Sequence, residues 1–323
     1  MNTQPAPESE ATPHQDEEPY PPIGYAWYVV GVLTVVYIFS FIDRQILSLL
    51  VEPIKRDFQI NDTKMSYLTG IAFVAFYTLC GIPFGRLADV KSRRAVIAVG
   101  FVLWSFMTAL CGATRNFMQM FLCRIGVGVG EASLSPSAFS LITDYFPKER
   151  LATAISVYSM GIYLGAGIAY LLGGIVIGFA SSQEMYDLPL IGATRSWQVI
   201  FFIVGLPGVF AALLLYTVKE PARRHRRLVT SQAGALKPEE VPLRQVLNYI
   251  LENKVTFLCH NIGFGLISLS TNAGGVWNPT YFIRNHGWTS AKVGIYMGII
   301  LAIMGTIGIV SAGRFSDWLS ERG

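Results

Sequence analysis

The chain has 323 residues, of which 52% are apolar and only 14% are charged, and its formal net charge at pH 7 is +4. Soluble domains contain about 25% charged residues, so this composition excludes an ordinary soluble protein and favours one that is surrounded by lipid. The four cysteines (Cys80, Cys111, Cys123 and Cys259) all fall within apolar segments and show no disulfide or metal spacing.

Apolar segments long enough to cross a membrane follow one another along the chain. We count eight, most of them at or above the roughly 20 residues that span a bilayer as a helix. They lie near residues 26–50, 66–86, 95–114, 117–141, 151–180, 197–218, 255–283 and 293–312. The predicted fold is therefore an all-α, polytopic membrane protein.

The segments divide the chain into four predicted regions. Residues 1–24 are rich in proline and acidic side chains and lack Lys and Arg, which predicts a disordered tail and not a signal peptide. Residues 25–220 hold six spans, residues 221–254 form a polar cytoplasmic linker, and residues 255–323 hold two spans of a second bundle. If that bundle also has six spans, it is incomplete at Gly323, and we expect a truncated or incompletely represented chain.

A short motif occurs twice, each time directly after an apolar segment. Residues 85–94 read GRLADVKSRR and residues 313–322 read GRFSDWLSER, so Gly, Arg and Asp recur at the same offsets. A repeated apolar half with the same loop is typical of secondary transporters built from two bundles. The first copy resembles the loop motif of the major facilitator superfamily, and the second copy is degraded.

The distribution of Lys and Arg predicts the orientation of the chain. Basic residues gather after the second, fourth and sixth spans (Arg86, Lys91, Arg93, Arg94, Lys148, Arg150, Arg223, Arg224, Arg226 and Arg227). By the positive-inside rule these loops, the N-terminus and the linker are cytoplasmic, in what we expect to be a bacterial inner membrane. The run from Arg223 to Arg227 is either a solvated loop or a contact for lipid headgroups.

Four charged side chains lie inside predicted spans: Asp43 and Arg44 in the first, Arg124 and Glu131 in the fourth. Each costs about 2.5–3.5 kcal/mol at the bilayer centre unless it is paired or hydrated. Arg124 and Glu131 are seven residues apart and share one helix face. The four groups could form one nearly neutral cluster, which is either a static ion-pair network or a proton-responsive substrate cavity.

Glu131 is the predicted principal proton carrier. At about 1.5 Å per residue it is the deepest of the four charges, about 21 Å from the outer end of its span.

Four prolines lie inside the predicted spans: Pro83, Pro136, Pro207 and Pro279. Each leaves one backbone carbonyl without its N–H donor, and lipid cannot supply another. We expect these helices to kink against neighbouring helices or a cavity.

Two longer stretches carry a more specific resemblance. Residues 41–79 and residues 124–156 resemble the Spinster family of the major facilitator superfamily, and a bacterial member most of all. The resemblance implies two six-helix bundles around a central cavity. Because eukaryotic members are similar to exporters of lysolipids and sphingosine-type lipids, it implies a transporter of an amphipathic or anionic solute that works by alternating access and is coupled to protons.

The resemblance also implies roles for the four buried charges. Arg44 or Arg124 would bind an anionic headgroup, and Glu131 with Asp43 would carry the proton. The fifth span lacks the Gly-Pro element of antiporters, because Ala166 follows Gly165. Symport and antiport therefore both stay open.

In the loop motif, the same resemblance implies a conformational latch. Gly85 would permit close helix approach, while Asp89 and Arg93 would hold the two halves together on the cytoplasmic side. Arg94 and the repeat residue Asp317 belong to the same predicted latch.

The seventh predicted span is polar for its length and offers further substrate contacts. Asn272 and Trp277 are the candidates there, although Trp277 could equally be an interfacial anchor. Organic-anion and sugar-acid symporters of the same superfamily have comparable seventh spans, so a small hydrophilic anion is the rival substrate.

No pattern in the chain predicts an enzyme. The four histidines are scattered, with no zinc spacing and no phosphate-binding loop. We expect no catalytic residue, metal or cofactor. The expected partners are a small-molecule or lipid substrate, protons and membrane lipids, with no nucleic acid, in a monomer. A receptor or a scramblase stays open as an alternative.

Overall fold

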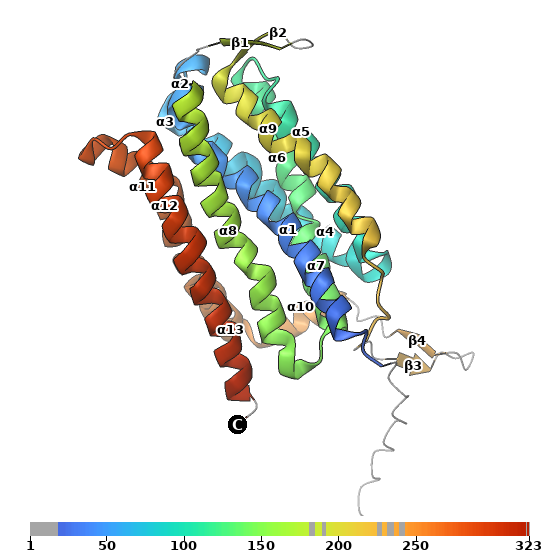
Figure 1. The fold of residues 1–323 in the computed structure, drawn as a ribbon. Coiled ribbons are helices and arrows are strands. Elements are labelled where there is room, and N and C mark those ends of the chain that lie inside the picture. Colours follow the sequence, from blue (N-terminus) through green and yellow to red (C-terminus); the bar gives the residue numbers. More distant parts are fainter. Residues whose placement is uncertain are drawn as a thin grey trace, which may run out of the picture.

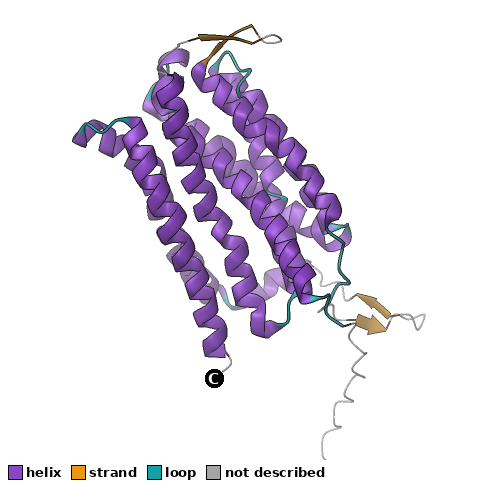
Figure 2. Cartoon of the chain, in the orientation of Figure 1, coloured by secondary structure: helices purple, strands orange, loops and turns teal. Residues whose placement is uncertain are grey.

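The computed structural model describes residues 19–180, 185–188, 192–224, 228–230, 236–238, 243–320 and 322. Helices make up most of this part of the chain, and two short antiparallel hairpins lie at opposite ends of the helices (Figure 2). The predicted helical fold is confirmed for the described residues.

The first part of the chain forms helices that run lengthwise beside one another (Figure 1). They are α1 (Ile23–Leu49), α2 (Val51–Phe58), α3 (Asp62–Ser66), the π-helix η1 (Tyr67–Ile71), α4 (Ala72–Val90), α5 (Arg93–Cys111), α6 (Phe117–Glu131), α7 (Leu134–Tyr145), α8 (Lys148–Ala180), α9 (Ser196–Ala211) and the 3-10 helix η2 (Ala212–Thr217). A hairpin of β1 (Met185–Leu188) and β2 (Gly192–Arg195) lies between α8 and α9.

The second part begins with a hairpin of β3 (Leu228–Thr230) and β4 (Leu236–Pro238). Its helices are α10 (Leu243–Glu252), α11 (Lys254–His286), α12 (Ser290–Ile300), the π-helix η3 (Leu301–Gly305) and α13 (Thr306–Ser320). Residues 1–18 of the predicted tail lie outside the described residues, and α1 begins at Ile23, inside the predicted tail. The described part of the predicted linker contains β3, β4 and α10.

Seven helical stretches in the described residues are long and apolar enough to cross a membrane. They correspond to seven of the eight predicted spans. The remaining one, predicted near residues 255–283, is the 33-residue helix α11, which is long enough but is not among the seven. Its asparagines, serines and threonines lower its mean hydropathy. This helix is therefore long enough to cross a membrane but less apolar than the seven stretches.

The two ends of the molecule differ in charge. We call the end at which α4 finishes and α5 and α8 begin the basic end, because basic side chains gather there (Lys91, Arg93, Arg94, Lys148 and Arg150). The β1–β2 hairpin lies at the opposite end (Figure 1).

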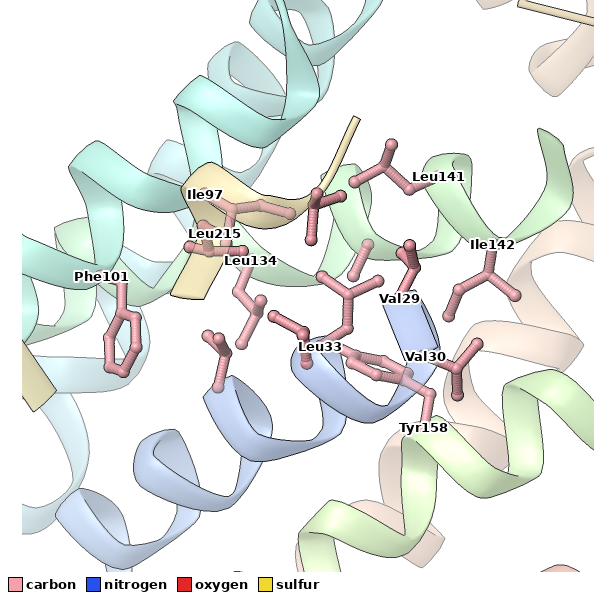
Figure 3. Close-up of a cluster of buried hydrophobic side chains, with 14 of the residues drawn as sticks. Val29, Val30, Leu33, Ile97, Phe101, Leu134, Leu141, Ile142, Tyr158 and Leu215 are labelled. Atoms are coloured by element: carbon pink, nitrogen blue, oxygen red, sulfur yellow. The ribbon is translucent and has the colours of Figure 1, made fainter. Parts of the chain in front are cut away.

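The largest buried apolar cluster of the described residues joins seven helical elements: α1, α4, α5, α6, α7, α8 and η2. Val29, Val30 and Leu33 of α1 pack among side chains of α5, α7, α8 and η2 (Figure 3). Inside a bilayer such packing stabilises through van der Waals contact, because lipid is as apolar as these side chains. The cluster fixes α1 against α5 and α7, and so fixes the polar side chains further along α1.

The fourth predicted span is broken into two helices. Asn116 caps the start of α6 by accepting a hydrogen bond from the backbone N–H of Gln119 at 3.0 Å. The span then breaks between Glu131 and Leu134, and Pro136 lies in the first turn of α7, where its missing N–H is tolerated. The predicted kink is present, and it follows directly after Glu131.

Helix α8 contacts both parts of the chain through glycines. A Cβ atom on Gly165 would lie 2.6 Å from the carbonyl oxygen of Ile38 in α1, and one on Gly167 would lie 2.8 Å from that of Gly298 in α12. Only glycine permits such close approach. Helix α8 therefore has two glycine contact faces, one toward α1 and one toward α12.

Candidate functional site

The four charged side chains of the predicted spans lie in one region, on α1 and α6. Asp43, Arg124 and Glu131 are at most 2% exposed, and Arg44 is partly buried. We call these four residues the charge cluster. The predicted convergence of Asp43 or Arg44 with Arg124 or Glu131 is confirmed by one ion pair.

That ion pair joins Arg44 to Glu131. Both Nε and Nη2 of Arg44 lie 2.6 Å from Oε2 of Glu131. The hydroxyl of Ser40, one turn before Arg44, donates to the same oxygen at 2.8 Å. One carboxylate oxygen thus accepts all three bonds, whereas Oε1 of Glu131 has no hydrogen-bond partner among the described residues.

Three aromatic rings surround the guanidinium of Arg44. Its central carbon lies 5.0 Å from the ring centre of Phe41, 4.7 Å from that of Phe73 and 4.9 Å from that of Tyr77. Rings at this distance attract the cation through their quadrupole. The carboxylate that Arg44 binds is itself fully buried, which strengthens the pairing of Arg44 with Glu131.

The other two members of the charge cluster are less well satisfied. Asp43 accepts a hydrogen bond from the hydroxyl of Thr108 at 3.1 Å through Oδ2, while its Oδ1 is buried without a partner in the described residues. Nε and Nη1 of Arg124 are likewise buried and unpartnered there, and its guanidinium lies 5.3 Å from the ring of Phe73. Buried charged donors without acceptors are costly, so this arrangement needs a reason.

A second buried charge network, which we call the Arg93 network, lies at the basic end. Arg93 is 1% exposed and donates to Glu220 at 2.7 Å, to both oxygens of Ser140 at 2.9 and 3.0 Å, and to Asp144. The backbone N–H of Arg224 donates to the other oxygen of Asp144 at 3.1 Å. These bonds tie α5 to α7 and to the segment after η2.

Glu220 is the most heavily bonded carboxylate of the Arg93 network. Burial raises the pKa of Glu220, but hydrogen bonds from Arg93, from the backbone N–H of Arg94 and from the hydroxyl of Ser92 outweigh it and lower the pKa below its usual range. Glu220 is therefore held in its ionised form.

The predicted latch residues have different partners from those expected. The hydrogen-bond partners of Arg93 lie within the first part of the chain, and Arg94 donates to the carbonyl of Val218 at 3.0 Å. Among the described residues both therefore stabilise one bundle, and neither joins the two parts of the chain. Within the described residues nothing lies within 4 Å of a Cβ atom on Gly85, so the close helix approach predicted there is absent. At Asp89 the guanidinium of Arg223 binds the main-chain carbonyl.

The repeat copy of the motif does join the two parts of the chain. Asp317 of α13 is 9% exposed and accepts hydrogen bonds from the backbone N–H groups of Ala152 at 3.2 Å and Thr153 at 2.8 Å, and from the Thr153 hydroxyl. These donors lie near the start of α8, where a negative charge is favourable. Of the predicted latch, Asp317 has the contact that a latch requires.

No hydrogen bond or ion pair within the described residues joins the two candidates on α11 to the charge cluster. Asn272 is exposed, and its amide donates to the carbonyl of Ser268 in its own helix at 2.8 Å. Trp277 is 39% exposed. In the described part of the chain, neither residue completes a site with Arg44 or Arg124.

Several contributors to the charge cluster and the Arg93 network were not predicted from the sequence. Ser40, Thr108 and Phe73 surround the charge cluster, and a polar or aromatic side chain within an apolar segment gives no distinguishing signal. Asp144 and Glu220 could have been found, because each is an acidic residue at the end of a span beside basic loops. Among the described residues no group of three or more His, Cys, Asp or Glu could hold a metal ion.

Apolar helices around a buried cluster of two acidic and two basic side chains define a polytopic membrane protein with an internal polar site. A sequence model of the Major Facilitator Superfamily matches residues 33–323. The chain belongs to this superfamily of transporters.

Individual relatives agree with the predicted resemblance. The chain is 30% identical to an MFS-type efflux pump of Mycolicibacterium smegmatis, over 92% of this chain and 64% of the relative. It is 25% identical to Protein spinster of Drosophila melanogaster, over 92% of this chain and 46% of the relative. It is 26% identical to a probable L-galactonate transporter of Escherichia coli, over 88% and 60%.

Solved structures of transporters are also similar to this chain. A bacterial homologue of the human lysosomal transporter Spinster, in an inward-facing and unoccupied conformation, matches with a TM-score of 0.69 and 30% identity, over 86% of this chain and 60% of that one. A D-xylose-proton symporter shares the fold, with a TM-score of 0.56 and 18% identity. The chain spans less than two thirds of the length of the curated relatives named above.

Proposed function

We propose that the protein is a proton-coupled secondary transporter that moves an amphipathic or anionic solute by alternating access. The observation that carries this proposal is the buried guanidinium of Arg124, whose Nε and Nη1 have no acceptor among the described residues. An anionic group of a solute would supply that acceptor. Membership of a transporter superfamily supports movement of the solute and not binding alone.

Glu131 is the proposed proton carrier, with Asp43 as its partner. Oε1 of Glu131 and Oδ1 of Asp43 are both buried without partners in the described part of the chain. Protonation of Glu131 would weaken its pairing with Arg44, which would then be free to bind the solute. Proton binding and solute binding would thus be linked through one guanidinium.

The proposed solute is a lipid-like molecule with an anionic headgroup. The rings of Phe41, Phe73 and Tyr77 place apolar surface beside Arg44, which suits a molecule with both an acyl chain and a charge. The resemblance to the Spinster family that residues 41–79 and 124–156 carry implies the same class. Asn272 and Trp277 of α11 remain proposed contacts for this solute.

A small hydrophilic organic anion is the second candidate. The similarity to a probable L-galactonate transporter and to a D-galactonate transporter favours it, and the unpartnered guanidinium of Arg124 would bind a sugar-acid carboxylate equally well.

Orientation and location form part of the proposal. We place the basic end, the N-terminus and the linker in the cytoplasm of a bacterial cell, because the positive-inside rule assigns clusters of Lys and Arg to that side. Asp317 would then hold α13 to α8 on the cytoplasmic side, as one element of a latch.

Uptake into proteoliposomes tests the proposal. Labelled lysolipid and labelled sugar acid are offered separately, with and without a proton gradient. Gradient-driven accumulation of lysolipid is expected, whereas accumulation of sugar acid alone would replace the lipid by the second candidate. Equal movement of lysolipid with and without the gradient would reject proton coupling.

A further inference from the structure

A proline within α11 leaves one backbone carbonyl without its usual partner. In an ordinary helix the carbonyl oxygen of Gly275 would accept a bond from the N–H of residue 279, but that residue is Pro279, which has no N–H. Such a carbonyl must find another donor when it lies away from water.

A tyrosine from another helix supplies that donor. The hydroxyl of Tyr170 in α8 donates to the carbonyl oxygen of Gly275 at 2.8 Å, and Tyr170 is 1% exposed. Gln45 of α1 lies beside the same place, with its amide nitrogen 3.8 Å from a Cβ atom on Gly275. The bond therefore joins α8, which precedes the linker, to α11, which follows it.

The bond lies toward the end of the molecule opposite the basic end. Helix α8 starts at the basic end, and Tyr170 is in its second half; α11 follows the linker, and Gly275 is in its second half as well. Further along α11, Arg284 donates to Glu52 at 2.8 Å. Arg284 also lies 3.9 Å from the carboxylate of Asp62. Helix α11 is therefore held at this end by a buried hydrogen bond from Tyr170 and by exposed ion pairs of Arg284.

We propose that Tyr170 is a positioning residue of the transport cycle. Its hydroxyl donates to the carbonyl that Pro279 leaves without an N–H partner, and this hydrogen bond exists only while the end of the molecule opposite the basic end is closed. This inference rests on the proposed alternating access. When α11 and α8 separate at this end, water replaces the tyrosine hydroxyl. The pair formed by Tyr170 and Pro279 therefore sets how readily this end opens.

Removal of the hydroxyl should favour the open conformation. In Tyr170→Phe the carbonyl of Gly275 has no hydrogen-bond donor in the closed conformation, whereas water still donates to it in the open conformation. Loss of one neutral hydrogen bond then shifts the equilibrium toward the open conformation about fivefold.

A cysteine reporter measures that shift. Gln45→Cys is introduced into a protein whose native cysteines are replaced, and a membrane-impermeant maleimide is added from the side opposite the basic end. Tyr170→Phe should be labelled about fivefold faster than its parent. Tyr163→Phe is the matched control, because Tyr163 lies on the same helix with its ring against Gly305, and its labelling rate should not change.

A second substitution shows whether the carbonyl is responsible. Pro279→Ala restores an N–H that can bond to Gly275, so Tyr170→Phe should have no effect on labelling in that background. An unchanged rate in Tyr170→Phe, or the same fivefold rise with and without Pro279, would overturn the inference. Labelling needs neither substrate nor a proton gradient, so a failed transport assay leaves this test intact.

Discussion

The charge cluster and the Arg93 network both bury arginines and carboxylates, but they differ in how completely those groups are satisfied. Arg93 donates to two carboxylates and to both oxygens of Ser140. Arg124 is buried to a similar extent, yet two of its nitrogens have no partner among the described residues. The exposed fractions and the residue types are alike, so the degree to which the polar groups are hydrogen-bonded is what separates the two.

The difference indicates what each group of charges is for. A saturated network keeps one arrangement, because every alternative leaves a buried charge without a partner. In an unsaturated cluster some donors and acceptors remain available, so the cluster can bind a proton or a solute anion reversibly. We therefore interpret the Arg93 network as structural and the charge cluster as the working site, and four substitutions test that distinction.

Loss of Arg93 should have the largest effect. Arg93→Met removes all donors to Asp144 from that side chain and leaves a buried carboxylate, which should destabilise the protein by about 3–5 kcal/mol. Thermal unfolding in detergent measures this. Arg94→Ala is the neighbouring control and should cost less than about 1.5 kcal/mol, because it removes one bond, to the carbonyl of Val218. Equal unfolding temperatures for the two variants would show that the Arg93 network does not hold the bundle together.

Arg124→Ala should show the opposite behaviour. No hydrogen bond among the described residues is lost, so the unfolding temperature should stay within a few degrees of the parent. The affinity for an anionic solute should fall about 10–100-fold, as expected for a charge-assisted bond. Equilibrium binding of the solute measures the loss, and Arg124→Lys should recover part of it. A variant that unfolds as Arg93→Met does, with unchanged affinity in the folded fraction, would assign Arg124 to the structure and not to the site.

Glu131→Gln tests the proton. A transporter that moves one proton with each solute can accumulate the solute about tenfold for each unit of pH difference across the membrane. The Gln variant should lose this accumulation, while it stays folded and still binds the solute. Uptake into liposomes as a function of the pH gradient is the measurement. The matched control is Glu149→Gln, at an exposed position at the start of α8. Accumulation that still follows the gradient in Glu131→Gln would transfer the role to Asp43, or would favour a static ion-pair network.

The same contrast explains which features the sequence could predict. Long apolar segments predicted the spans, and the four charges inside two of those spans predicted one cluster, because both depend on residues close in the chain or on depth alone. Which of the four charges pair with one another was not predicted. The partners of Arg93 were not predicted. Asp144 and Glu220 are far from Arg93 in the chain, and which helix ends meet depends on packing that no local pattern encodes.

Glu220→Gln should have the smallest effect on the free energy of unfolding. The pH dependence of that effect tests whether the charge of Glu220 contributes to the Arg93 network. Because hydrogen bonds lower the pKa of Glu220 in the folded protein, the ionised carboxylate stabilises the fold. That contribution is fully present above the ordinary glutamate value of about 4.3 and is lost as the pH falls through the lowered value. The Gln variant should be less stable than its parent by about 1 kcal/mol near neutral pH, and the difference should shrink at acidic pH. Unfolding temperatures recorded between neutral and acidic pH measure both. A difference that stays constant over this range would mean that the charge of Glu220 contributes nothing and that the side chain acts only by its shape.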